Sequence, residues 1–291
     1  TGYELAAVNT ATGAVERFTG VLPGDNLGNH TATQNLVPDL NATRDLGTAA
    51  NTWRTIRLSD RLELNGSTFL DDLAPFGTFV GVTLNTTVTG LDNTVVGFGA
   101  GSDLTTGNEN TLMGSSAGAI LTTGAGNTIV GAKAGSFATG AANTFFGTNT
   151  GQDASGDANT LIGYDAGRNN AGGVENTMVG SNAGRVNTAN ANSFVGASAG
   201  LANTTGTNNT FMGYNAGNNT TTTSNNAFFG TFSGSTNVTG SEISLFGSRS
   251  NVLAAGLQNA TAIGFRAAVN ANNSLVLGSI NGINGATANT N

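Results

Sequence analysis

Few residues in this chain are of the types that enzyme chemistry requires. There is one histidine, His30, and there is no cysteine. A Ser-His-Asp or Cys-His arrangement needs a histidine held beside a nucleophile, and His30 stands in a turn-like stretch where we expect a structural or surface side chain. The lack of cysteine excludes disulfides, thiolate metal sites and a cysteine nucleophile.

The acidic residues are not spaced as in an active site. Asp71-Asp72 is the only adjacent acidic pair, and we interpret it as a solvated junction rather than as the carboxylates of a glycosidase or a metal site. Farther along, the acids occupy different positions of a repeat, so they do not stack: Asp92, Asp103, Glu109, Asp153, Asp157, Asp165, Glu175 and Glu242. The glycine-rich stretch 124–133, which ends at Lys133, has the wrong spacing for a phosphate-binding loop. We therefore predict no enzyme activity, no cofactor and no metal.

The composition restricts the partners. Charged residues make up 9% of the 291 residues and the net charge is -7, which argues against a nucleic-acid partner. No apolar run reaches the length of ~18–20 residues that spans a membrane, so we expect no membrane insertion by this segment.

A glycine recurs almost every 16 or 17 residues through the last three quarters of the chain. These glycines are Gly81, Gly97, Gly114, Gly131, Gly147, Gly163, Gly180, Gly196, Gly213, Gly230, Gly247, Gly264 and Gly278. A repeat this short is one coil of a solenoid and not an independent domain. The sequence therefore predicts an all-β chain with a parallel β-solenoid, or β-roll, of about 13 short coils.

Each coil has the pattern Asn-Thr-h-h-Gly-x-x-Ala-Gly, where h is apolar. The Thr-h-h triplet favours a short strand, and the glycines favour tight corners. The asparagine before the strand tolerates the left-handed region, and stacked asparagines can form amide ladders; they are Asn110, Asn127, Asn143, Asn159, Asn176 and Asn209.

The two apolar residues of the triplet are adjacent, so they point to opposite faces of the strand. One points into the coil and the other must point outward. The outward set is Val96, Met113, Val130, Phe146, Ile162, Val179, Val195, Met212 and Phe229. A continuous apolar stripe of this kind favours a partner, and the simplest partner is another copy of the chain. We predict a homo-oligomer, and a homotrimer in particular, with this stripe as the subunit interface.

The threonines of the triplets support a second hypothesis. Thr94, Thr111, Thr128, Thr144, Thr160, Thr177, Ser193 and Thr210 lie in one column, on the same side as the outward apolar residues. A flat Thr/Asn face is a weak resemblance to ice-binding solenoids, and it could also bind carbohydrate. A third hypothesis, a glycan-degrading enzyme, has no clustered carboxylates to support it.

The last two repeats, Asn259–Gly264 and Asn273–Gly278, stand 14 residues apart and resemble the head repeat of trimeric autotransporter adhesins, which form left-handed parallel β-roll trimers. The longer earlier units are similar to repeats of bacterial and phage fibre proteins. The resemblance covers residues 77–288. It implies an extracellular fibre segment, in a cell-surface adhesin or in a tail fibre, whose partners are itself, neighbouring fibre segments and a surface glycan or receptor. Arm loops would present Tyr164, Tyr214 and Phe232.

Residues 1–76 lack the repeat, and we predict an N-terminal β adaptor there. The stretch 45–59 resembles a small β-element of tail fibres, and Ile56, Leu58, Leu62 and Leu64 share one face of an alternating strand. Trp53 is expected to anchor the core of the adaptor. The solenoid should then cover 77–281, followed by a tail at 282–291.

Overall fold

The computed structural model describes residues 77–81 and 88–278 in full, and the backbone alone of residues 5–8, 15–18, 61–64 and 67–71. All regular secondary structure in these residues is β-strand, which confirms the all-β prediction. The chain divides into two units, Thr1–Arg57 and Leu58–Asn291. The first unit contains an antiparallel hairpin of β1 (Leu5–Val8) and β2 (Val15–Phe18). His30, Trp53, Asp72, and the predicted tail lie outside the described residues.

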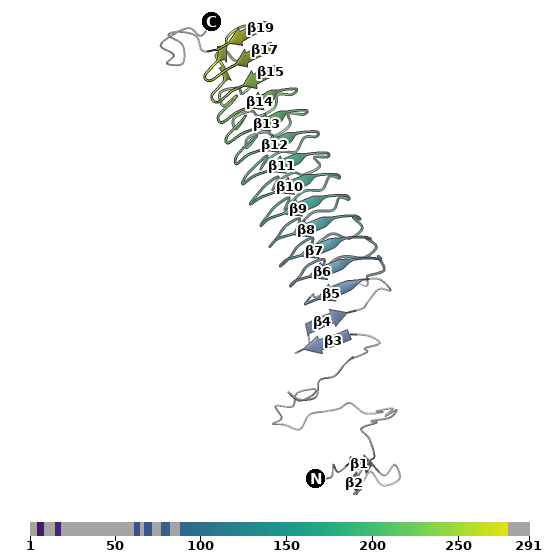
Figure 1. Ribbon diagram of the computed structural model, residues 1–291. Coiled ribbons are helices and arrows are strands. Elements are labelled where there is room, and N and C mark those ends of the chain that lie inside the picture. Colours follow the sequence, from purple (N-terminus) through teal and green to yellow (C-terminus); the bar gives the residue numbers. More distant parts are fainter. Residues whose placement is uncertain are drawn as a thin grey trace. The chain divides into compact units, whose positions relative to one another are not determined.

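The second unit is a parallel β-solenoid, as predicted. Its strands stack one above the other, and each is followed by a loop that returns the chain to the next strand (Figure 1). Eleven strands from β5 to β15 follow in chain order: β5 (Thr78–Val80), β6 (Thr94–Val96), β7 (Thr111–Met113), β8 (Thr128–Val130), β9 (Thr144–Phe146), β10 (Thr160–Ile162), β11 (Thr177–Val179), β12 (Ser193–Val195), β13 (Thr210–Met212), β14 (Ala227–Phe229) and β15 (Ser241–Phe246). β17 (Gln258–Ile263) and β19 (Ser274–Leu277) complete this sheet. The Thr-h-h triplets are therefore strands, paired threonine to threonine in register.

The solenoid has about 11 turns, not the 13 coils predicted. The prediction counted anchoring glycines, which is a count of strands; a stack of strands encloses fewer full turns than it has strands. The last turns also differ in form. There the return segment contains two short strands, β16 (Asn251–Val252) and β18 (Ala268–Val269), which pair parallel in a second sheet.

The first strand of the stack does not end in an open edge. β3 (Arg61–Leu64) and β4 (Ser67–Asp71) form an antiparallel hairpin, and β4 pairs antiparallel with β5. An unpaired parallel edge would offer its backbone groups to any other chain, and the hairpin covers part of the β5 edge, where Asp71 pairs with Phe79. Part of the region predicted as adaptor thus belongs to the same sheet as the solenoid.

The core is a single column of side chains that runs through the coils. The first apolar residue of every triplet is fully buried: Val95, Leu112, Ile129, Phe145, Leu161, Met178, Phe194, Phe211 and Phe228. The last three of these are aromatic, and Phe211 stacks on Phe194 and on Phe228 with ring centroids 4.9 and 4.7 Å apart. A small residue, most often alanine, completes the core beside each second glycine, because a larger side chain has no room there.

The asparagine before each strand is buried and forms the predicted amide ladder. Asn110 Nδ2 donates to Asn93 Oδ1 at 3.0 Å and to the Gly124 carbonyl at 2.9 Å, and the same contacts recur in most coils. The ladder asparagine does not itself adopt the left-handed region that its residue type tolerates. The residue before it does so, for example Glu109 and Ala158, each with φ of 58°; this placement turns the asparagine side chain into the core.

Replacing Asn127 by alanine tests the ladder. The Asn127 side chain donates to Asn110 Oδ1 and to the Gly140 carbonyl, and its Oδ1 accepts from the Asn143 N–H. Alanine leaves the last two groups buried without a partner at about 1–3 kcal/mol each, so we expect the free energy of unfolding to fall by about 2–5 kcal/mol in a denaturant titration. Asn169→Ala is the control, because that side chain is exposed; equal losses in both variants would contradict the ladder's role.

A third column of glycines escaped the sequence analysis. Gly90, Gly107, Gly124, Gly140, Gly156, Gly173 and Gly206 each stand three residues before a ladder asparagine. A Cβ at any of these positions would overlap a backbone carbonyl of the following coil. Their carbonyls accept the asparagine amides, as Gly107 does from Asn93 at 2.9 Å. The spacing Gly-x-x-Asn was visible in the sequence and would have revealed this column.

Candidate functional site

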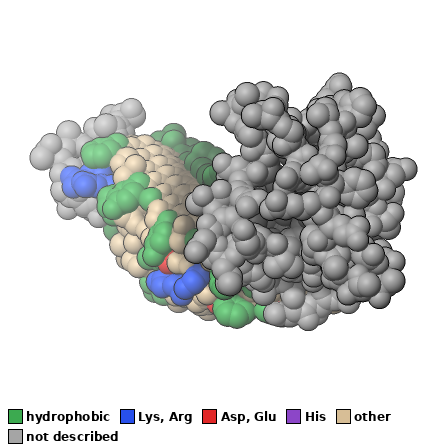
Figure 2. Space-filling view, turned by 90° about the horizontal axis from the view of Figure 1, so that it is seen from below, with side chains coloured by type: hydrophobic (Ala, Val, Ile, Leu, Met, Phe, Trp, Pro, Cys, Tyr) green, Lys and Arg blue, Asp and Glu red, His purple; other side chains and the backbone are tan. Residues whose placement is uncertain are grey.

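The outward stripe lies on the outer face of the sheet, as the alternation of side chains along each strand predicted. Most of its side chains remain accessible in the single chain; Phe146 is 57% exposed, Met212 46% and Met113 44%. The stripe is longer than the predicted set, because Val80 precedes it in β5 and Phe246, Ile263 and Leu277 continue it in the last three strands of the sheet. Figure 2 shows several patches of apolar side chains on the part of the described surface that is visible in this view.

The stripe is continuous because the strands pair in register. Val130 is paired with Met113 on one side and with Phe146 on the other. The rings of Phe229 and Phe246 stack at 5.0 Å between centroids, on the outside of the coil. Exposed apolar surface of this extent is uncommon on monomers and marks contact sites.

The threonine column runs beside the stripe on the same outer face. Thr94, Thr128, Thr144 and Thr177 are exposed, and the intervening threonines are half-buried. The asparagines predicted to share this face do not, because their amides are buried and used by the ladder. The outer face of the sheet is therefore threonine and apolar residues, without asparagine.

The described residues contain no group of three or more His, Asp or Glu side chains able to hold a metal ion. Across the same ranges, no helix is long and apolar enough to cross a bilayer. The expectation that the acidic residues of the solenoid occupy different positions of the coil is wrong for four of them: Asp92, Glu109, Glu175 and Glu242 all stand at the left-handed position just before the ladder position, with φ of 58–60°.

One acidic residue is nevertheless part of an ion-pair cluster. Asp165 is almost fully buried, and its Oδ2 lies 3.6 Å from Arg168 Nη1 and 3.6 Å from Arg185 Nε. Arg168 and Arg185 stand at the same position of successive coils. Asn149 Nδ2 donates to the Asp165 Oδ1 at 3.0 Å. A single carboxylate therefore compensates two stacked guanidinium groups.

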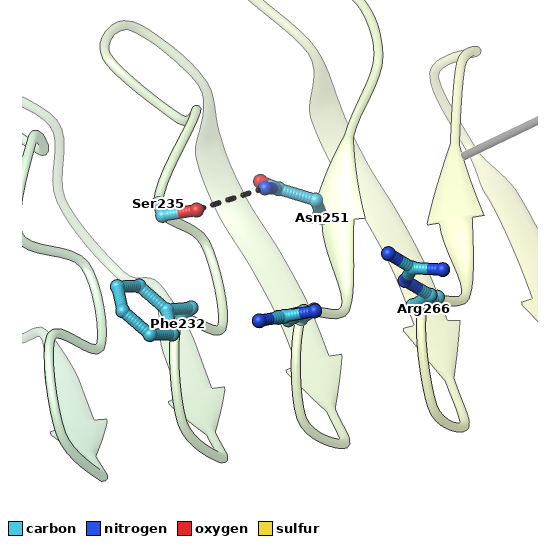
Figure 3. Close-up of a pocket in the computed structure, with 5 residues that line it drawn as sticks. Phe232, Ser235, Asn251 and Arg266 are labelled. Carbon is cyan, nitrogen blue, oxygen red and sulfur yellow. Dashed lines mark hydrogen bonds between the residues drawn. The ribbon is translucent and has the colours of Figure 1, made fainter. Parts of the chain in front are cut away.

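A cavity of about 350 Å³ lies near the C-terminal end of the stack. It is lined by Phe232, Ser235, Arg249, Asn251 and Arg266, from three successive coils. In Figure 3, Phe232 and Arg266 lie at the two ends of the site, and the hydrogen bond from Asn251 to Ser235 lies along one side. We call these five residues the terminal pocket.

The walls of the terminal pocket are held in place by the backbone and by aromatic contacts. Phe232, Arg249 and Arg266 each occupy the second position after an anchoring glycine, with φ of 57°, 60° and 56°. The Arg249 guanidinium carbon lies 6.0 Å from the centre of the Phe232 ring, and Tyr214 packs edge-on against the same ring at 5.4 Å. Arg266 lies 5.6 Å from the centre of the Phe265 ring.

The aromatic residues expected on arm loops lie elsewhere. Tyr164 and Tyr214 directly follow anchoring glycines, so they stand at the corner just after the strand; they are 54% and 53% exposed. Phe232 lies one residue farther on the same corner. These aromatic side chains are therefore displayed because they stand one or two residues after an anchoring glycine, and not because they lie on the variable segment of the coil.

No protein-family model matches the chain, and no curated protein is similar to it. The architecture described above is thus the basis for assigning a role.

Proposed function

We propose that this chain is a structural segment of an extracellular homotrimeric fibre, in which the outward stripe is the subunit interface and the exposed corners serve attachment. The single observation that carries this proposal is the continuous apolar stripe on the outer face of the sheet. The extracellular setting rests on the resemblance of the repeats to those of adhesins and tail fibres.

Burial of apolar surface favours a multichain assembly, because a fully buried apolar side chain contributes about 1.5–3 kcal/mol relative to an exposed one. Burial of the outward side chains between chains supplies a second apolar column per coil. Three chains can place these columns around one axis with the same contacts in each.

The molecular mass of the full chain in solution tests the proposal. We expect light scattering to give three times the 28.9 kDa of one chain, and a trimer that persists on dilution to nanomolar concentration. A stable monomer with the stripe open to water would rule the proposal out. A dimer would rule out the threefold arrangement and keep the interface.

The exposed threonine column supports one alternative, a module that binds ice or carbohydrate through this outer face. Regularly spaced hydroxyl groups on a flat sheet are the observation in its favour. Thermal hysteresis at micromolar concentration would favour this alternative over a scaffold. Its absence, together with a trimer, leaves the threonines as polar groups within or beside the interface.

A further inference from the structure

We infer that the terminal pocket binds an acidic saccharide, in the form of a pyranose ring that carries a carboxylate or sulfate group. This inference rests on the proposed role of the chain as a fibre that attaches to surfaces, and it assigns the chemistry of that attachment. The observation behind it is a pair of arginines at the same position of successive coils that line a cavity together with an aromatic ring.

The two arginines of the pocket are not paired with an acid in the part of the chain that the structure describes. Both ion pairs found there involve Asp165. After Glu175 the sequence contains a single acidic residue, Glu242, against three arginines. Glu242 lies near the start of β15, whereas Arg249 follows the end of that strand. This end of the solenoid is therefore locally positive in a chain whose net charge is -7.

The same molecule shows how a stacked arginine pair is compensated. Arg168 and Arg185, one coil apart, share the carboxylate of Asp165. Arg249 and Arg266 are likewise one coil apart, and neighbouring strands are separated by about 4.8 Å, so their like charges repel. Among the described residues, no carboxylate pairs with the two arginines of the terminal pocket. An oxyanion with two or more acceptor oxygens, such as a carboxylate or a sulfate, matches guanidinium forks better than a point charge does.

The choice of side chains in the pocket opposes the local backbone preference. The second position after the anchoring glycine is left-handed in the described coils, and the earlier coils carry small or polar residues there: Gly99, Ser116, Lys133, Asn149, Asp165, Asn182, Ser198 and Asn215. The last three coils carry Phe232, Arg249 and Arg266 there instead. A bulky side chain at positive φ is unfavourable, so these residues are explained by what they contact and not by the turn.

The remaining wall indicates a sugar rather than a bare anion. Phe232 adds an apolar ring to the charged wall, and Ser235 and Asn251 add polar groups. Asn251 Oδ1 already accepts from the Thr236 N–H at 3.2 Å and from the Thr236 hydroxyl at 2.7 Å, which makes this side rigid. The volume of about 350 Å³ is at the lower end of the range for small-ligand sites and suits one or two rings.

A matched pair of sugars tests the inference on the assembled full chain. Methyl glucuronide and methyl glucoside differ only at C6, which is a carboxylate in the first and a hydroxymethyl group in the second, and saturation-transfer NMR measures the binding of both. We expect the glucuronide to bind at least tenfold more tightly than the glucoside. Arg249→Asn with Arg266→Asn should remove that difference, and Phe232→Asn should weaken both sugars about equally.

Each variant places in the pocket the residue that other coils carry at that position, so the fold should be retained. Lys133→Asn, at the equivalent position of a distant coil, removes one positive charge outside the pocket and should leave binding unchanged.

Equal binding of both sugars would overturn the inference. Inorganic phosphate that competes as well as the glucuronide, without saturation transfer to the ring protons, would also overturn it, by showing an anion site only. Loss of binding in Lys133→Asn would reduce it to nonspecific charge attraction. A chain that is trimeric but binds no sugar refutes this inference alone, and a monomer refutes the proposed function alone.

Discussion

Gly163→Ala is expected to prevent the solenoid from forming across its centre. Gly163 has φ of 130°, outside the range that other residues adopt, and a Cβ there would lie 2.6 Å from the Gly180 carbonyl oxygen and 2.7 Å from its carbon. Both atoms are backbone and are held by the ladder, in which the Gly180 N–H donates to the Ile162 carbonyl at 2.8 Å. The coils would have to separate, so we expect a loss of more than about 4 kcal/mol and little folded protein by circular dichroism and soluble yield.

A second glycine separates this clash from the cost of a left-handed residue. Gly126 has φ of 68°, and a Cβ there would meet nothing closer than the Ala142 Cα at 4.0 Å. Later coils already place alanine at the same position, at Ala142 and Ala158. Gly126→Ala should therefore cost only about 1–2 kcal/mol. If both variants lost the same stability, close packing of coil on coil would not be the reason for the glycine repeat.

Val130→Asp is expected to abolish the trimer. Val130 lies in the middle of the outward stripe, between Met113 and Phe146 in the paired strands. In the proposed assembly this position is buried against partner chains, where an unpaired carboxylate costs several kcal/mol per chain. Light scattering should then show monomers or aggregates where the unaltered chain gives a trimer.

The control for this variant adds the same charge elsewhere in the same coil. Thr139 is exposed on the segment that returns the chain to the next strand, so Thr139→Asp should assemble normally. If Val130→Asp also assembles as the unaltered chain does, the outward stripe is not the interface. Circular dichroism of the soluble fraction shows whether the coil itself stays folded. We expect that it does, because the core side chain Ile129 is unchanged.

Local patterns in the sequence predicted much of the architecture. The strands coincide with the Thr-h-h triplets, and the inward and outward apolar residues are those that period-two alternation assigned. Alternation within a strand depends only on adjacent residues, so no knowledge of the tertiary fold was needed. The anchoring glycines likewise report a local backbone requirement, a positive φ at the end of each strand.

Contacts between coils were less accessible. The third glycine column, the burial of the asparagine amides and the left-handed residue before them follow from how closely one coil approaches the next. The count of anchoring glycines also overestimated the number of turns. It is a count of strands, and a stack of strands encloses fewer full turns than it has strands. The aromatic residues were expected on the variable segments, because the sequence does not show which part of a coil lies at its corner.

By itself the sequence determined the period, the strands and the side of each strand that faces the core, because these depend on residue type and spacing over a few positions. Only the tertiary structure decided which side chains gather into a pocket or an ion-pair cluster. Phe232, Arg249 and Arg266 form one pocket, and Arg168 and Arg185 share one carboxylate, because each coil brings residues 16 or 17 apart in the sequence to within one strand spacing, about 4.8 Å. That neighbourhood is set by the path of a whole coil, which no local pattern specifies.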